Sequence, residues 1–185
     1  MKPVLMLAVM IMGLSAKAID ITDLQIAGSG CSVPTGGHEL IPIAGSVERF
    51  GIPIMMNIDK LAANLIARKS CTMSLAVKLN AGEKLQVIDV AQKVKLTASK
   101  GAKASIQLEV FLAGSQGVPL KAEVSAVNKQ VRSSQLLNAA GVVAESECGK
   151  DVIVRANSSV MLQGAARSKV SSDMLALTLR VVACQ

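Results

Sequence analysis

Four cysteines are the residues whose type and spacing most clearly predict a chemistry in this chain: Cys31, Cys71, Cys148 and Cys184. No two form a Cys-x-x-Cys motif and the chain has one histidine, so a zinc site would have to gather all four from distant segments. In an exported chain an even number of cysteines favours two disulfides instead. Of the three possible pairings we favour Cys31–Cys71 and Cys148–Cys184, which close loops of similar size.

Hydrolytic chemistry would depend on His38, the single histidine, which lies beside Glu39 near several glycines. No nucleophile-elbow motif is present, and we interpret His38 as a surface or strand-edge residue. A glycosidase would need two carboxylates facing a sugar cleft. Spacing selects no such pair, and the scarcity of aromatic residues argues against the cleft. The carboxylate candidates are Glu39, Glu48, Asp59, Glu109 and Glu123.

Glu145, Glu147 and Asp151 form an acidic group close in sequence that could offer oxygen ligands to Ca²⁺. The group does not match an EF-hand loop, and we interpret it as a solvated loop beside a disulfide. We therefore expect no catalytic residue, no metal and no cofactor.

The first 18 residues have the three parts of a secretory signal peptide. Met1-Lys2 is a short positive start, Val4–Leu14 is apolar, and Ala16-Lys17-Ala18 offers small residues to a signal peptidase. Because a spanning helix needs about 20 apolar residues, we expect cleavage after Ala18 rather than a retained anchor. The sequence thus predicts a signal peptide at 1–18 and a single β-rich secreted domain at 19–185, periplasmic or extracellular and without a transmembrane span.

The formal net charge is +7, and the chain contains no tryptophan, no tyrosine and only two phenylalanines. Stacking platforms for bases or sugars are therefore scarce, so we expect no nucleic-acid partner, and a dedicated lectin function is disfavoured. The basic residues are interpreted as solvated strand faces and turn tips, with weak attraction to an anionic polymer as the alternative. They include Lys93, Lys95, Lys100, Lys103, Arg167 and Lys169.

Apolar and polar residues alternate with a period of two, most clearly over Arg68–Leu79 and Ala104–Leu112. Residues typical of turns separate such segments at intervals of about 8–12 residues. This pattern is typical of an antiparallel sandwich or barrel. We predict an all-β fold, an antiparallel β-sandwich of about nine short strands.

Several connections can be predicted from local residue types. Asn80-Ala81-Gly82 has hairpin chemistry, and a change of phase near Ile88-Asp89 indicates a bulge. Asn157-Ser158-Ser159, which also fits a glycosylation sequon, is predicted as a turn between two strands. One or two short helices are possible, over Asp59–Lys69, where a long loop is the alternative, and near Ser133–Ala140.

Four segments together resemble a known family: Gly28-Ser29-Gly30-Cys31, Arg68-Lys69-Ser70-Cys71 at the head of an alternating strand, Glu147-Cys148-Gly149, and a final strand ending at Cys184. They are similar to small secreted four-cysteine proteins of unknown function found in fungi and bacteria. The resemblance covers nearly all of the chain after residue 18. It implies an exported β-rich domain in which the cysteines are structural positions, without an established activity.

The function that these observations favour is a non-enzymatic, disulfide-stapled structural or interaction module of the cell envelope or extracellular space. Its partner would be an unknown protein or an envelope polymer. Two alternatives stay open: a small secreted hydrolase that uses His38, and a binder of anionic envelope polymer.

Overall fold

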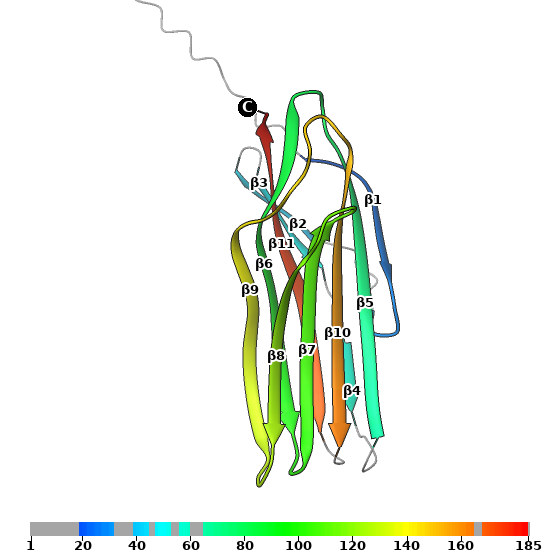
Figure 1. Ribbon diagram of the computed structural model, residues 1–185, viewed down its shortest axis with the longest axis vertical. Helices are drawn as coiled ribbons and strands as arrows, with labels where there is room; N and C mark the ends of the chain where they lie inside the picture. The colour runs from blue at the N-terminus through cyan, green and yellow to red at the C-terminus, as the bar shows by residue number, and fades with distance from the viewer. Residues whose placement is uncertain are drawn as a thin grey trace, which may run out of the picture.

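The computed structural model describes residues 19–31, 39–44, 47–52, 56–59, 65–164 and 168–184. Within these ranges the chain forms eleven β-strands and no helix, and hence none long enough to cross a bilayer. The strands form two antiparallel sheets that pack face to face (Figure 1). The predicted all-β antiparallel sandwich is confirmed, whereas its strands are more numerous and several are longer than expected.

Sheet A has five strands in the order β1-β5-β10-β7-β8. Their bounds are β1 (Asp20–Ala27), β5 (Leu65–Lys78), β10 (Val152–Gly164), β7 (Ala102–Leu112) and β8 (Val118–Ala126). Sheet B has six strands, five of them in the order β2-β3-β11-β6-β9, while β4 pairs with β11. Their bounds are β2 (Glu39–Ala44), β3 (Val47–Ile52), β4 (Met56–Asp59), β11 (Lys169–Ala183), β6 (Glu83–Ala98) and β9 (Val131–Glu145).

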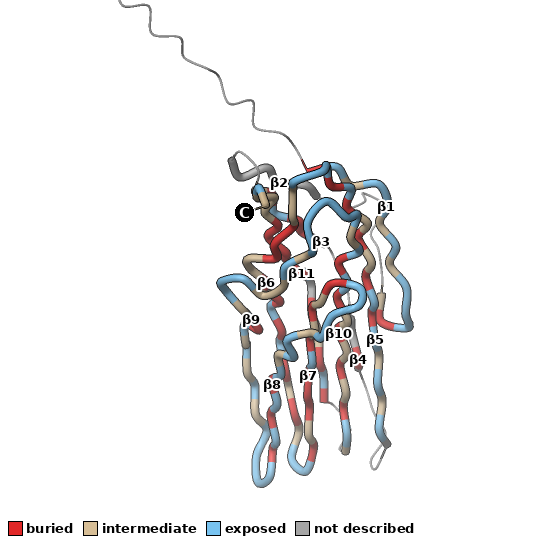
Figure 2. Tube along the Cα trace, turned by 45° about the horizontal axis from the view of Figure 1, so that its top comes forward, coloured by how far each residue is buried: buried red, intermediate tan, exposed pale blue. Residues whose placement is uncertain are grey.

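The core lies between the sheets because successive side chains of a strand point to opposite faces. In β5, Met73 and Leu75 point into the core and are buried, while Thr72 points outward and is exposed. Figure 2 shows the same alternation of buried and exposed positions along many of the strands. The core is built mainly from aliphatic side chains, and Phe50 is the one aromatic residue among its described members.

The hairpin predicted at Asn80–Gly82 is wrong. β5 lies in sheet A and β6 in sheet B, so this turn carries the chain from one sheet to the other. The turn after Lys100 makes the return crossing to β7. Glycine supplies the positive φ at both turns, with values of 83° at Gly82 and 79° at Gly101. The residue types of a turn therefore predict that the chain reverses, but they do not predict which sheet the next strand joins.

The helix predicted near Ser133–Ala140 is also wrong, because these residues lie in β9 and pair with β6. Of the second candidate helix, Asp59 ends β4 and Leu65–Lys69 opens β5, while residues 60–64 lie outside the described part. The predicted bulge is confirmed by a register shift between Val87 and Asp89.

The turn predicted at Asn157-Ser158-Ser159 is wrong, since all three residues lie in the middle of β10. Ser158 points inward and is 1% exposed, and its neighbours point outward. A run of three polar residues can occupy a central strand here because the inward hydroxyl finds a hydrogen-bond partner in the core.

Two disulfides join segments at the margins of the strands. Cys31, which follows β1, is bonded to Cys71 in β5. Cys148, in the connection between β9 and β10, is bonded to Cys184 at the end of β11. This is the pairing favoured above, and each bridge links parts of the chain that the sheets also bring together.

Candidate functional site

The outer face of sheet A presents polar side chains from its three central strands, β5, β10 and β7. The antiparallel register places Asn157 of β10 between Thr72 of β5 and Glu109 of β7. Strands lie about 4.8 Å apart, so three neighbours span about 10 Å. Outward residues form two such rows across the sheet, Thr72-Asn157-Glu109 and Ser70-Ser159-Gln107.

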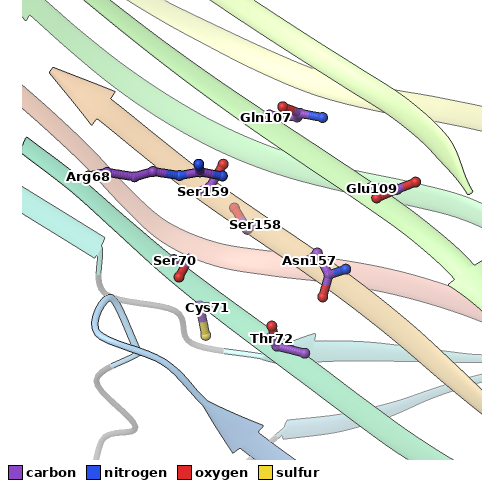
Figure 3. Close-up of a pocket in the computed structure, with 9 residues that line it drawn as sticks. All are labelled: Arg68, Ser70, Cys71, Thr72, Gln107, Glu109, Asn157, Ser158 and Ser159. Carbon is purple, nitrogen blue, oxygen red and sulfur yellow. The ribbon is translucent and has the colours of Figure 1, made fainter. Parts of the chain in front are cut away.

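These two rows line a hollow of about 300 Å³, which we call the polar groove (Figure 3). A volume of this size lies at the lower end of the range for ligand sites. Its lining residues are Arg68, Ser70, Cys71, Thr72, Gln107, Glu109, Asn157, Ser158 and Ser159.

Most outward side chains of the polar groove form no side-chain hydrogen bond or ion pair with the part of the chain that the structure describes. Across the described ranges, Arg68, Thr72, Gln107, Glu109 and Asn157 form no side-chain hydrogen bond or ion pair with another residue. Polar groups that the fold does not use are satisfied by solvent or by a ligand. The groove therefore offers donors and acceptors that the described residues do not use, at positions set by the sheet.

The chemistry of the groove is that of a hydrogen-bonding surface. Its two amides and its hydroxyls can each donate and accept, and they outnumber the charged groups. Arg68 adds a cation and Glu109 an anion, so the charges among the lining residues balance. This set suits a ligand rich in hydroxyl groups, which also donate and accept.

A buried polar network lies directly behind the groove and joins the two sheets. The Oγ of Ser158 in β10 donates to Oε1 of Gln92 in β6 at 2.9 Å, and Nε2 of Gln92 donates to Oγ of Ser172 in β11 at 2.8 Å. All three residues are at most 1% exposed. The network holds β10, the central strand of the groove, against sheet B.

The segment after β1 is pressed against β5 beside the groove. The backbone N–H of Gly30 donates to the carbonyl of Ser70 at 2.9 Å. Gly28 has a φ of +137°, and a Cβ there would lie 2.3 Å from the same carbonyl oxygen. Only glycine permits this approach, and the Cys31–Cys71 disulfide closes the contact next to Ser70.

A second hollow, of about 370 Å³, continues the groove toward β8 and shares Glu109 with it. Its lining includes Phe111, which is half-buried and paired with Arg155 of β10. Gly117 leaves room for the carboxylate, because a Cβ at that position would lie 2.4 Å from Cγ of Glu109. One aromatic face thus adjoins the polar groove.

The sequence-predicted carboxylates do not gather into a catalytic pair. Glu109 lines the groove, whereas Glu123 of β8 forms ion pairs with Lys103 at 2.8 Å and Lys121 at 3.6 Å. The hydrogen bond from Lys103, above all, lowers the pKa of Glu123. Glu48 is buried in sheet B. The remaining candidates lie on strands of sheet B, Glu39 in β2 and Asp59 in β4, and His38 lies outside the described residues.

The acidic group considered as a Ca²⁺ site interacts with neighbouring protein groups instead. Hydrogen bonds from Gln86 first and Lys84 second lower the pKa of Glu145 below its ordinary value of 4.5. Glu147 pairs with the lysine three residues later, and Asp151 accepts a backbone N–H at 3.0 Å. In the part of the chain that can be described, no group of three or more His, Cys, Asp or Glu could hold a metal.

Some of the basic residues lie close together on the outer face of sheet B. Lys93 and Lys95 alternate along β6, and Thr97 further along pairs with Arg132 of β9 and Lys169 of β11. These four basic side chains are exposed. The other basic candidates lie elsewhere: Lys100 in the turn before β7, Lys103 in its ion pair on sheet A, and Arg167 outside the described ranges.

Sequence reasoning missed most of the polar groove because it searched for titratable and metal-binding groups. Of the groove residues it singled out Cys71 and Glu109 as candidates, and it assigned Asn157 to a turn. The available signal was the polar character of successive outward positions in β5, β7 and β10. That signal becomes a site only once the register shows that these strands are neighbours.

Comparison with solved structures gives matches of low identity to carbohydrate-binding modules. No match is found among curated proteins. Three solved structures are similar at this level: TmCBM61 in complex with β-1,4-galactotriose (13% identity, TM-score 0.27, covering 86% of this chain and 88% of that one), the mannan-recognising TmCBM27 (8%, 0.31, 88% and 98%), and the xylan-binding module CBM15 (12%, 0.34, 87% and 95%).

Family comparison gives the more direct result. Residues 17–182, nearly the whole chain, match the family described as a domain of unknown function, DUF4360. The matched range contains Cys31, Cys71 and Cys148 and every described strand of both sheets except the last residue of β11, while Cys184 lies two residues beyond its end. The chain therefore belongs to the DUF4360 family.

Proposed function

We propose that this protein is an exported interaction module that binds a hydroxyl-rich polymer, a polysaccharide, in the polar groove of sheet A. The observation that carries the proposal is the set of outward amide, hydroxyl and charged side chains without a partner in the described protein. Hydroxyl groups of a sugar can satisfy both the donors and the acceptors of such a surface.

The scarcity of aromatic residues affects the expected strength of binding. Among the described residues that line the groove and its extension, Phe111 is the one aromatic side chain. Stacking contributes substantially to binding of flat ligands, so we expect low affinity for a single short oligosaccharide. A long chain that occupies the groove repeatedly would gain avidity.

The placement of the carboxylates supports binding rather than hydrolysis. Glycoside hydrolysis ordinarily uses two carboxyl groups on either side of the scissile bond. Glu109 is the single carboxylate among the described residues that line the groove. We therefore propose that the protein binds the polymer and releases it without cleaving it.

Affinity electrophoresis tests this proposal with gels that contain a soluble polysaccharide: a mannan, a xylan, a galactan or, as an acidic example, polygalacturonate. We expect at least one of them to retard the protein. Each lost hydrogen bond is worth about 1 kcal/mol, so Gln107→Ala with Asn157→Ala should raise the dissociation constant derived from the retardation roughly 30-fold. Asn138→Ala is the matched control, because Asn138 is exposed on β9 of the opposite sheet. Retardation that survives the double substitution would place binding outside the groove.

A second candidate function is binding of an anionic polymer by the basic face of sheet B. It rests on the exposed side chains of Lys93, Lys95, Arg132 and Lys169 on three adjacent strands. Retention on an anionic matrix would then fall steeply as salt rises, and Lys93→Ala with Arg132→Ala would weaken it. Retention that does not depend on salt would argue against this second function.

A further inference from the structure

A buried hydrogen bond joins the start of β1 to the opposite sheet. The backbone nitrogen of Ile19 donates to Oε1 of Glu48 at 2.8 Å. Ile19 is 7% exposed and Glu48 is 8% exposed, so both ends of the bond are shielded from water. Ile19 precedes the edge strand of sheet A and Glu48 lies in β3 of sheet B.

Glu48 occupies an inward position that apolar residues fill elsewhere. It alternates with buried Phe50 along β3 and lies opposite Leu179 of β11. A buried carboxylate is costly unless a positive charge or several hydrogen bonds compensate it. No cationic side chain of the described ranges forms an ion pair with this carboxylate. Its observed partner is the nitrogen of Ile19.

We infer that Glu48 is the binding site for the α-ammonium group that cleavage after Ala18 creates on Ile19. Hydrolysis by a processing peptidase breaks the Ala18–Ile19 peptide bond with one water molecule. The hydroxyl adds to the Ala18 carbonyl carbon and the hydrogen to the Ile19 nitrogen, which takes up a further proton from solvent. A positive charge then forms on the nitrogen that lies 2.8 Å from Glu48.

The consequence is that processing strengthens the fold. In the uncleaved chain this nitrogen is a neutral amide, and in the cleaved chain it is a charged donor. Hydrogen bonds to charged groups are roughly twice as strong as neutral ones, and this one bridges the two sheets. The inference goes beyond the proposed polymer binding and does not depend on it.

Four proteins test the inference: chains that begin at Ile19 or at Ala18, each with Glu48 or with Glu48→Gln. A fusion cut directly before the chosen residue supplies both starts. We expect the chain that begins at Ile19 to unfold about 5 °C higher than the one that begins at Ala18, and the difference to vanish with Glu48→Gln. Glu109→Gln, a carboxylate change on the outer face of sheet A, should leave the difference intact.

A second measurement on the unsubstituted chain keeps the test decisive if Glu48→Gln fails to fold. At neutral pH the α-amine of Ile19 should react with an acylating reagent at least about tenfold more slowly in the native protein than in denaturant, because it is buried in an ion pair. Equal rates would overturn the inference. So would equal unfolding temperatures for the two starts, a difference that persists in Glu48→Gln, or an exported protein that begins at another residue.

Discussion

Replacing Gln92 by leucine removes the centre of the network behind the polar groove while nearly preserving side-chain size. The substitution takes away one hydrogen bond to Ser158 and one to Ser172. Ser172 keeps its bond to the carbonyl of Lys93 at 3.2 Å, whereas the Ser158 hydroxyl loses its partner in the core. A buried hydroxyl without a partner costs about 1–3 kcal/mol. For a chain of this length, that cost lowers Tm by roughly 2–12 °C.

The double variant Gln92→Leu with Ser158→Ala separates the network from simple repacking. When both partners become apolar, no buried hydroxyl is stranded. We therefore expect the double variant to be less destabilised than the sum of its two single variants. Urea and thermal unfolding followed by circular dichroism measure all three, with Gln163→Leu on the exposed face of β10 as the matched control. An unfolding temperature of Gln92→Leu equal to that of the unsubstituted protein would refute this expectation. So would a loss of stability in the double variant equal to the sum of the losses in the two single variants.

Two further predictions concern the margins of the fold. The pKa of Glu145 is lowered chiefly by the hydrogen bond from Gln86, so its contribution to stability is present above 4.5 and is lost as the pH falls through the lowered value. Thermal unfolding across this range should show a smaller acid-induced loss in Glu145→Gln, and an unchanged loss would contradict the assignment. Gly28→Ala should destabilise by more than Gly101→Ala, for which we expect about 1–2 kcal/mol. Both glycines have positive φ, but an added Cβ would lie 2.3 Å from the Ser70 carbonyl oxygen at Gly28 and would have nothing within 4 Å at Gly101. Urea unfolding measures both losses of stability. Equal losses would contradict a close contact between Gly28 and Ser70.

The strands with one buried face could be predicted from the sequence because their alternation is complete. β7 is the clearest example, with Ile106 and Leu108 buried on one side and Gln107 exposed on the other. The two disulfides could also be predicted from the number of cysteines. The sheet that each strand joins could not, because the turn at Asn80–Gly82 has the same local chemistry in a hairpin and in a crossing between sheets.

For a related reason, β10 was predicted as two strands with a turn between them, and the polar groove was missed. From the sequence alone, Ser158 is typical of a turn. In the fold it lies in the core because Gln92, which is distant in sequence, accepts its hydrogen bond. Asn157 and Glu109 gain meaning as a site only from the register that places them side by side. Local polarity was visible in the sequence, but the long-range pairing that converts it into a surface was not.

Affinity electrophoresis of the groove variants tests the central claim most directly. The account predicts that a polysaccharide retards the unsubstituted protein, that Gln107→Ala with Asn157→Ala largely abolishes the retardation, and that Asn138→Ala leaves it unchanged. Circular dichroism of the three proteins provides the control for folding. Absence of retardation by every polysaccharide tested, or equal retardation of all three proteins, would contradict the claim that this groove is a polymer-binding site.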